Sequence, residues 1–274
     1  VILCLIQIGG LGVITIAVFI TRLSGRKIGL MQRSTMQEAI AMPQMGGIVR
    51  MTGFILKMVA MIELLGAVAF LPVMIPEFGV GKGIWYAVFH SISSFCNAGF
   101  DLMGVKEQYS SLTSYTGNVP VNVVVMLLIV VGGIGFLTWD DIKRNGIHLR
   151  RYRMQSKVVL SVTCVLILLP AAYFYFHEFD LPMWEGMSTG EKVLAALFQS
   201  VTTRTAGYNT IDLTKLTESG QMIMVILMLI GGSPGSTAGG MKVTTFAVLF
   251  ATAIAVFKRR PNAHIFGRRI PNDT

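Results

Sequence analysis

The sequence has few charged residues for its length. Aspartate, glutamate, lysine and arginine make up 14% of the 274 residues, whereas 53% are hydrophobic and the mean hydropathy is +0.64. Soluble domains carry about a quarter charged residues. The low charge argues against a water-soluble protein and indicates that lipid surrounds much of the chain.

Cysteine and histidine are also scarce, with three and four residues. Cys4, Cys96 and Cys164 lie far apart in sequence and show neither zinc spacing nor a disulfide pattern. The histidines, which lack the mutual spacing of a metal or catalytic site, are His90, His148, His177 and His264. The apolar runs hold no paired acids and no Ser/His arrangement. We therefore expect no catalytic residue, no enzyme activity and no cofactor.

Basic residues exceed acidic ones by nine, which can indicate a nucleic-acid partner. The lysines and arginines nevertheless cluster beside apolar runs and not on a soluble domain with a nucleic-acid-binding motif. We expect no nucleic-acid partner and interpret the charge as setting the orientation of the chain in a lipid bilayer.

Long apolar runs recur along the chain, and about 20 residues suffice to span the hydrocarbon core. The candidate spans are residues 1–20, 51–75, 119–139, 158–176 and the interrupted stretch 222–257. Residues 84–97 and 191–203 are too short to span, and their place between two spans favours re-entrant pore helices over buried or interfacial helices. Glu63 is costly inside its span, so we expect it to have a polar partner or to face water there.

Charge divides the loops into two groups. Residues 21–57, 140–157 and 258–274 are rich in lysine and arginine, whereas the remaining loops carry four lysines and nine acids. Because lysine and arginine are retained on the cytoplasmic side, the three basic segments are predicted to be cytoplasmic. The acidic loops then face outside, where they would concentrate cations.

A unit of span, outer loop, pore helix, glycine turn and span occurs at residues 51–139 and again at 158–257. The segment FHSISSFCNAGF (89–100) matches FQSVTTRTAGY (198–208) with one gap. Residues 1–20 look like the closing span of an earlier unit, and the linkers between units are residues 21–50, 140–157 and 258–274. The predicted fold is an all-α membrane protein of repeated span, pore-helix and span units, with one broken span.

An Ala-Gly-aromatic turn follows each short helix. A potassium filter replaces the water shell of the ion with backbone carbonyls, and glycine permits the positive φ that such turns need. For either turn alone, a plain glycine-ended helix is the simpler explanation, but their shared setting favours a filter. The predicted carbonyl ligands are Asn97, Ala98, Gly99, Phe100, Thr205, Ala206, Gly207 and Tyr208. Arg204 is predicted to anchor the second turn behind the path, since an exposed arginine would repel a cation.

The segment GGSPGSTAGGMK interrupts the last apolar stretch. Five glycines and Pro234 make it costly as helix, and irregular backbone at membrane depth is tolerated only where protein or a water-filled path surrounds it. We predict an intramembrane gate in which Lys242 places positive charge near the closed pathway. Its residues are Gly231, Gly232, Ser233, Pro234, Gly235, Ser236, Thr237, Ala238, Gly239, Gly240 and Lys242. A nucleotide-binding loop is the weaker alternative, because Met241 interrupts the required Gly-Lys-Ser/Thr ending.

Together, residues 91–101, 200–209 and 231–242 resemble the Trk/Ktr/HKT superfamily of potassium transporters, most closely its bacterial KtrB-like membrane subunits. The resemblance extends over essentially the whole chain. It implies four repeats around one potassium pathway, built like a potassium-channel pore, with Gly99 and Gly207 as filter glycines and residues 231–242 as the gate. The sequence would then be an internal fragment holding the end of the first repeat and the second and third repeats, without the first filter and the fourth repeat.

The resemblance also implies potassium uptake across the plasma membrane, the bacterial inner membrane, by a multi-pass protein. The implied partners are potassium, a second copy in a homodimer and a cytoplasmic ring of nucleotide-binding regulatory subunits. Sodium dependence and the preference for potassium over sodium stay open. A secondary transporter for another monovalent cation or solute is the alternative, although it does not predict duplicated pore helices with Ala-Gly-aromatic turns.

Overall fold

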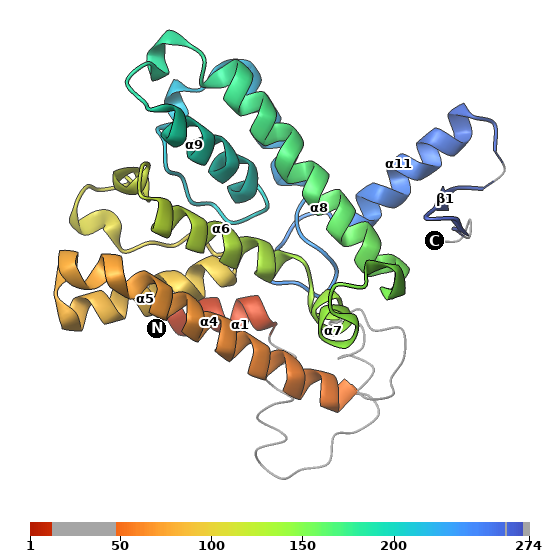
Figure 1. The fold of residues 1–274 in the computed structure, drawn as a ribbon, viewed down its shortest axis with the longest axis horizontal. Coiled ribbons are helices and arrows are strands. Elements are labelled where there is room, and N and C mark those ends of the chain that lie inside the picture. Colours follow the sequence, from red (N-terminus) through yellow and green to blue (C-terminus); the bar gives the residue numbers. More distant parts are fainter. Residues whose placement is uncertain (13–47, 261, 271–274) are drawn as a thin grey trace.

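A computed structural model describes residues 1–12, 48–260 and 262–270 (Figure 1). Most of the expected cytoplasmic linker 21–50, and the second half of the expected span 1–20, lie outside these residues. The helices are α1 (Ile2–Leu11), α4 (Ile48–Phe78), α5 (Val80–Phe95), α6 (Val119–Gly133), α7 (Phe136–Asn145), α8 (Met154–Tyr173), α9 (Thr189–Thr202), α10 (Glu218–Leu229) and α11 (Val243–Phe257). A two-stranded hairpin, β1 (His264–Ile265) and β2 (Arg268–Arg269), follows α11.

Two of the described helices are long and apolar enough to cross a membrane, Arg50–Phe78 within α4 and Met154–Glu178, which is α8 with its π-helical extension. They confirm the predicted spans 51–75 and 158–176. The apolar helices α10 and α11 are shorter and are separated by residues 230–242, so the predicted break in the stretch 222–257 is also confirmed.

The predicted span over residues 119–139 is not one straight helix. Helix α6 ends at Gly133, α7 begins at Phe136, and the two helices are bent by 97°. Gly135 has a φ of 85°, and the Phe136 N–H donates to the carbonyl of Gly235 at 2.8 Å, so the bend is fixed by the loop between α10 and α11. Hydropathy alone shows only a continuous apolar run here.

Helices α5 and α9 correspond to the two predicted pore helices, with 16 and 14 residues. Figure 1 shows α5 alongside α4 and α9 alongside α8. The Ser91 hydroxyl donates to the carbonyl of Glu63 on α4 at 2.6 Å, and Ser200 donates in the same way to Ile167 on α8 at 2.6 Å. Each pore helix is therefore tied to the span before it by a serine at the same position of the aligned segments.

Helix α1 contacts this first pair through Glu63. The Gln7 Nε2 donates to both carboxylate oxygens of Glu63, at 2.9 and 3.2 Å, and the Cys96 Sγ lies 4.0 Å from the nearer one. The expected polar partner of Glu63 is thus confirmed. Since Cys96 directly precedes the first Ala-Gly turn, the carboxylate lies behind that turn.

The chain between α7 and α8 forms an ion-paired corner. Asp140 and Asp141 are buried in α7, and Arg153 before α8 reaches both, at 3.0 and 3.5 Å. The Ser156 hydroxyl also donates to Asp141 at 2.6 Å. Buried carboxylates are tolerated when they are paired and hydrogen-bonded, so this corner holds α7 against α8.

Replacement of Gly132 by alanine is expected to destabilise the fold. A Cβ at this position would lie 2.1 Å from the Phe95 carbonyl oxygen and 2.7 Å from the Thr237 hydroxyl, so the backbone of one of these segments would have to shift. Overpacking of this kind lowers the free energy of unfolding by about 1–3 kcal/mol, measurable by thermal unfolding in detergent. Gly190→Ala is the control, because nothing lies within 4 Å of its Cβ position. Equal unfolding temperatures for the two variants would contradict the expected clash.

Candidate ion-pathway site

The two Ala-Gly turns, far apart in sequence, lie against each other in the structure. A Cβ on Gly99 would lie 2.3 Å from the carbonyl oxygen of Ala206, and the Cα of Gly99 is 3.7 Å from the Cβ position of Gly207. The φ angles of these glycines are 68° and 90°, which disfavour any side chain. Both the close approach and the backbone conformation therefore require glycine at Gly99.

The turns also share an unusual backbone pattern. Asn97 and Thr205, each two residues before its glycine, have φ angles of 50° and 66°, while the alanine between has a negative φ. A positive φ is a genuine outlier for a β-branched residue such as Thr205. Backbone strain of this kind concentrates at functional sites, where the surrounding structure maintains it.

Hydroxyl groups on the pore helices hold the aromatic residue that ends each turn. The Ser93 Oγ donates to the carbonyl of Phe100 at 2.7 Å, and the Thr202 Oγ1 donates to that of Tyr208 at 2.6 Å. The Tyr208 hydroxyl donates to Phe100 as well, at 3.0 Å. The Phe100 carbonyl thus uses both of its lone pairs within the protein.

Arg204 and Thr205 join the second turn to the loop of residues 230–242. Arg204 is buried, and its Nη2 donates to the Gly231 carbonyl at 3.2 Å. The Thr205 hydroxyl accepts a bond from the Gly239 N–H at 3.0 Å. Both side chains therefore point to the loop that the sequence predicts to be a gate.

The loop folds back on itself. An isolated parallel bridge pairs Ile230 with Met241, and the Gly231 N–H donates to the Met241 carbonyl at 3.0 Å. A Cβ on Gly231 would lie 1.8 Å from the carbonyl oxygen of Gly239, so the two arms pack backbone to backbone. The Lys242 Nζ donates to the Ala238 carbonyl at 2.9 Å and closes the loop at its end.

The loop is docked against the first pore helix and the α6–α7 bend. The Thr237 hydroxyl donates to the carbonyl of Phe95, the last residue of α5, at 2.8 Å, and its N–H donates to Gly132 at 3.2 Å. The Ser233 N–H donates to the Gly133 carbonyl at 2.9 Å. All of the predicted gate residues lie in this one loop, next to both turns.

Buried amides also occur next to the turns. The side chains of Asn97 and Gln199 are buried, and neither amide has a hydrogen-bond partner within the described part of the chain. Buried unpaired polar groups are costly and are rare in native proteins. Asn97 belongs to the first turn and Gln199 lies in the last turn of α9, so each of these unpaired amides is close to one of the two turns.

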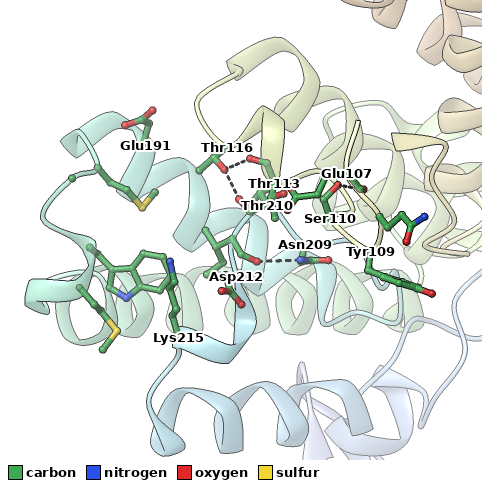
Figure 2. Close-up of a pocket in the computed structure, with 16 residues that line it drawn as sticks. Glu107, Tyr109, Ser110, Thr113, Thr116, Glu191, Asn209, Thr210, Asp212 and Lys215 are labelled. Atoms are coloured by element: carbon green, nitrogen blue, oxygen red, sulfur yellow. Dashed lines mark hydrogen bonds between the residues drawn. The ribbon is translucent and has the colours of Figure 1, made fainter. Parts of the chain in front are cut away.

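A pocket of about 600 Å³ lies between residues 107–116, residues 183–191 and the segment that follows the second turn (Figure 2). The backbone around it is bonded across the two halves, since the Leu112 N–H donates to the Asn209 carbonyl at 3.0 Å and the Thr116 hydroxyl to that of Thr210. Its charged residues are Glu107, Glu191, Asp212 and Lys215. Its three acids all lie in the loops that the sequence analysis identifies as acidic.

Two of these carboxylates are shifted toward their charged form. Hydrogen bonds from the backbone and then the side chain of Ser188 lower the pKa of Glu191, and bonds from the side chain and then the backbone of Thr214 lower the pKa of Asp212. Both groups belong to local caps, because Ser188 and Glu191 form the capping box of α9. The pocket therefore keeps negative charge at neutral pH.

We expect Glu191 and Asp212 to protonate at a lower pH than ordinary carboxyls, whose pKa values are about 4. A lowered folded-state pKa means that the capping interaction contributes stability above the ordinary pKa and loses it as pH falls through the folded value. Carbon NMR titration of the two carboxyls measures this. Ser188→Ala should raise the pKa of Glu191 toward its ordinary value and leave Asp212 unchanged; an unshifted Glu191 in the wild type would contradict the assignment.

Comparison with known proteins places the chain among cation transport proteins. The TrkH family, described as cation transport protein, matches residues 2–274. The chain is 41% identical over 270 residues to the potassium/sodium uptake protein NtpJ of Enterococcus hirae, covering 98% of the chain and 58% of that protein. It is 36% identical over 271 residues to the Ktr system potassium uptake protein B of Bacillus subtilis, covering 98% and 60%.

The fold is similar to that of a solved structure, the crystal structure of the potassium transporter TrkH from Vibrio parahaemolyticus. The TM-score is 0.69 at 22% identity, over 97% of this chain and 52% of that one. The chain thus spans about three-fifths of the length of the curated relatives named above and about half of the solved one. With its helical membrane fold and a family match over nearly its whole length, the chain belongs to the TrkH family of cation transport proteins.

Proposed function

We propose that the chain forms part of a potassium-conducting pore that takes up potassium down its electrochemical gradient. The observation that carries this proposal is the meeting of two left-handed turns at Gly99 and Gly207, each at the end of a pore helix. Backbone carbonyls arranged around an axis replace the water shell of a dehydrated potassium ion. The names of the relatives, a potassium/sodium uptake protein and a Ktr potassium uptake protein, support the same ion class.

The proposed ion ligands are backbone carbonyls and not side chains. They are those of Asn97, Ala98, Gly99, Thr205, Ala206 and Gly207. The carbonyls of Phe100 and Tyr208 already accept hydrogen bonds from Ser93 and Thr202, so these residues anchor the turns. Both pore helices direct their C-terminal, partially negative ends toward the turns, which favours a cation. The acidic outer pocket raises the local cation concentration.

The loop of residues 230–242 is proposed to be the gate. Its contacts to Phe95, Gly132 and Gly133 hold it against the end of α5 and the α6–α7 bend. Opening would release these bonds together with the Gly239–Thr205 bond. Lys242, whose ammonium group is fixed on the loop by Ala238, places positive charge beside the closed path.

The wider assembly is part of the proposal. We propose that the chain works as in a Ktr-type system, in the bacterial plasma membrane. Its partners would be a second copy in a homodimer and a cytoplasmic ring of nucleotide-binding subunits that acts on the gate. The proposed function is transport and not enzyme catalysis, and among the described residues no group of three metal-binding side chains occurs. A secondary transporter for another solute remains the alternative, which ion competition would separate.

Potassium uptake by the complete protein in cells that lack their own uptake systems tests the pore. Gly99→Ala and Gly207→Ala are each expected to lower uptake about tenfold or more, because an alanine at a positive φ costs roughly 1–3 kcal/mol. Gly190→Ala, in an uncrowded position of α9, should transport normally. Failure of the wild type to restore growth at low potassium, or full uptake by both turn variants at wild-type abundance, would reject the proposal.

The gate is tested by Lys242→Gln. Glutamine keeps a hydrogen-bond donor but removes the positive charge, so uptake in the ungated state should rise about two- to fivefold if the charge opposes a cation in the closed path. Lys258→Gln, at the exposed C-terminal cap of α11, is the matched control. Unchanged flux and unchanged regulation in Lys242→Gln would show that the charge of Lys242 has no role in gating.

A further inference from the structure

The phenol of Tyr208 connects the two turns directly. Tyr208 is 1% exposed, although the neighbouring Gly207 is exposed. The hydroxyl donates to the carbonyl oxygen of Phe100, across the boundary between the two halves, at 3.0 Å. Buried tyrosine hydroxyls normally find a partner, but here the partner is the backbone of the opposite turn.

This bond completes a continuous bridge between the two pore helices. Ser93 on α5 donates to the Phe100 carbonyl at 2.7 Å, and the same carbonyl accepts the bond from Tyr208. The Tyr208 carbonyl accepts in turn from Thr202 on α9 at 2.6 Å. The chain of contacts thus runs from α5 through both turns to α9, and the turns cannot separate without breaking one of its bonds.

The bridge is one-sided. The residue of the first turn that corresponds to Tyr208 is Phe100, which has no hydroxyl and is 54% exposed. A packing role alone would be served by phenylalanine at both positions. The hydroxyl of Tyr208 therefore adds something that packing does not require, namely a fixed distance between the two backbones.

We infer that Tyr208 determines ion specificity by holding the two filter strands at a set spacing through its bond to Phe100. The inference rests on the proposed function, since spacing matters only if these strands surround an ion. The dimensions of a carbonyl cage and the field of its carbonyls decide between potassium and sodium. A strand free to relax inward would let the cage contract around the smaller sodium ion. Tyr208 is thus a positioning residue, because its side chain acts through the Phe100 backbone.

Tyr208→Phe in the complete protein tests the inference. Purified protein in liposomes takes up labelled rubidium, as a potassium probe, against increasing sodium or potassium. Loss of one neutral hydrogen bond should lower the preference for potassium over sodium about three- to tenfold while total uptake is retained. Tyr152→Phe is the matched control, since that phenol is also buried and donates to a backbone carbonyl, that of Gly146, in the α7–α8 corner.

A second variant guards against misfolding. Ser93→Ala removes the other donor to the Phe100 carbonyl and should lower the same preference. Ser93→Thr keeps a hydroxyl at this position and should keep the preference of the wild type. The double variant with Tyr208→Phe should show a non-additive effect, because both side chains act on one carbonyl. If Tyr208→Phe does not fold, Ser93→Ala decides the question.

The outcomes separate the inference from the function beneath it. If folded Tyr208→Phe keeps the wild-type preference for potassium over sodium, the inference is overturned and potassium uptake stands. If Tyr208→Phe does not fold, the same result in Ser93→Ala overturns it. An equal loss of preference in Tyr152→Phe overturns it too, because the effect would then follow from general destabilisation. A wild-type protein that takes up no rubidium at all overturns the proposed function itself.

Discussion

Every peptide group inside a membrane must find its hydrogen bonds within the protein, and this constraint explains how the irregular segments are arranged. The loop of residues 230–242 and the α6–α7 bend each interrupt helical bonding between apolar helices. They satisfy one another: Ser233 donates to Gly133, Thr237 to Gly132, and Phe136 in return to Gly235. Two breaks that would each be unfavourable alone are therefore stable as a pair.

The same constraint shapes the two turns. Each needs backbone groups that leave the helical pattern, and each is held by hydroxyls from its own pore helix. Ser91 and Ser200 occupy aligned positions, and each donates to the span that precedes its pore helix. Ser93 and Thr202 are also aligned, and each donates to the aromatic residue that ends its turn. This matching supports the proposed duplication more strongly than the sequence similarity of the segments, because it concerns the partners and not only the residue types.

Hydropathy and glycine patterns were sufficient to predict most of the helices. Length and apolar character are properties of each segment by itself. They were enough to predict the spans at 51–75 and 158–176, both short helices and the break after residue 229. The bend at Gly135 could not be predicted, because it depends on a loop about 100 residues later in the chain and the local run stays apolar. Glycine spacing likewise pointed to the turns, but the bonds of Tyr208 and Thr205 are tertiary and leave no local pattern.

The contacts of the loop imply that movement of the proposed gate would disturb the proposed filter. One loop binds the end of the first pore helix through Thr237 and the second turn through Thr205, whose positive φ is strained. Release of the Gly239–Thr205 bond removes part of what maintains that strain, so the turn gains freedom to relax when the loop departs. The Tyr208–Phe100 bond joins the second turn to the first and involves no residue of the loop. The second turn is therefore anchored at both Thr205 and Tyr208, and departure of the loop would release the first anchor while the second stays in place.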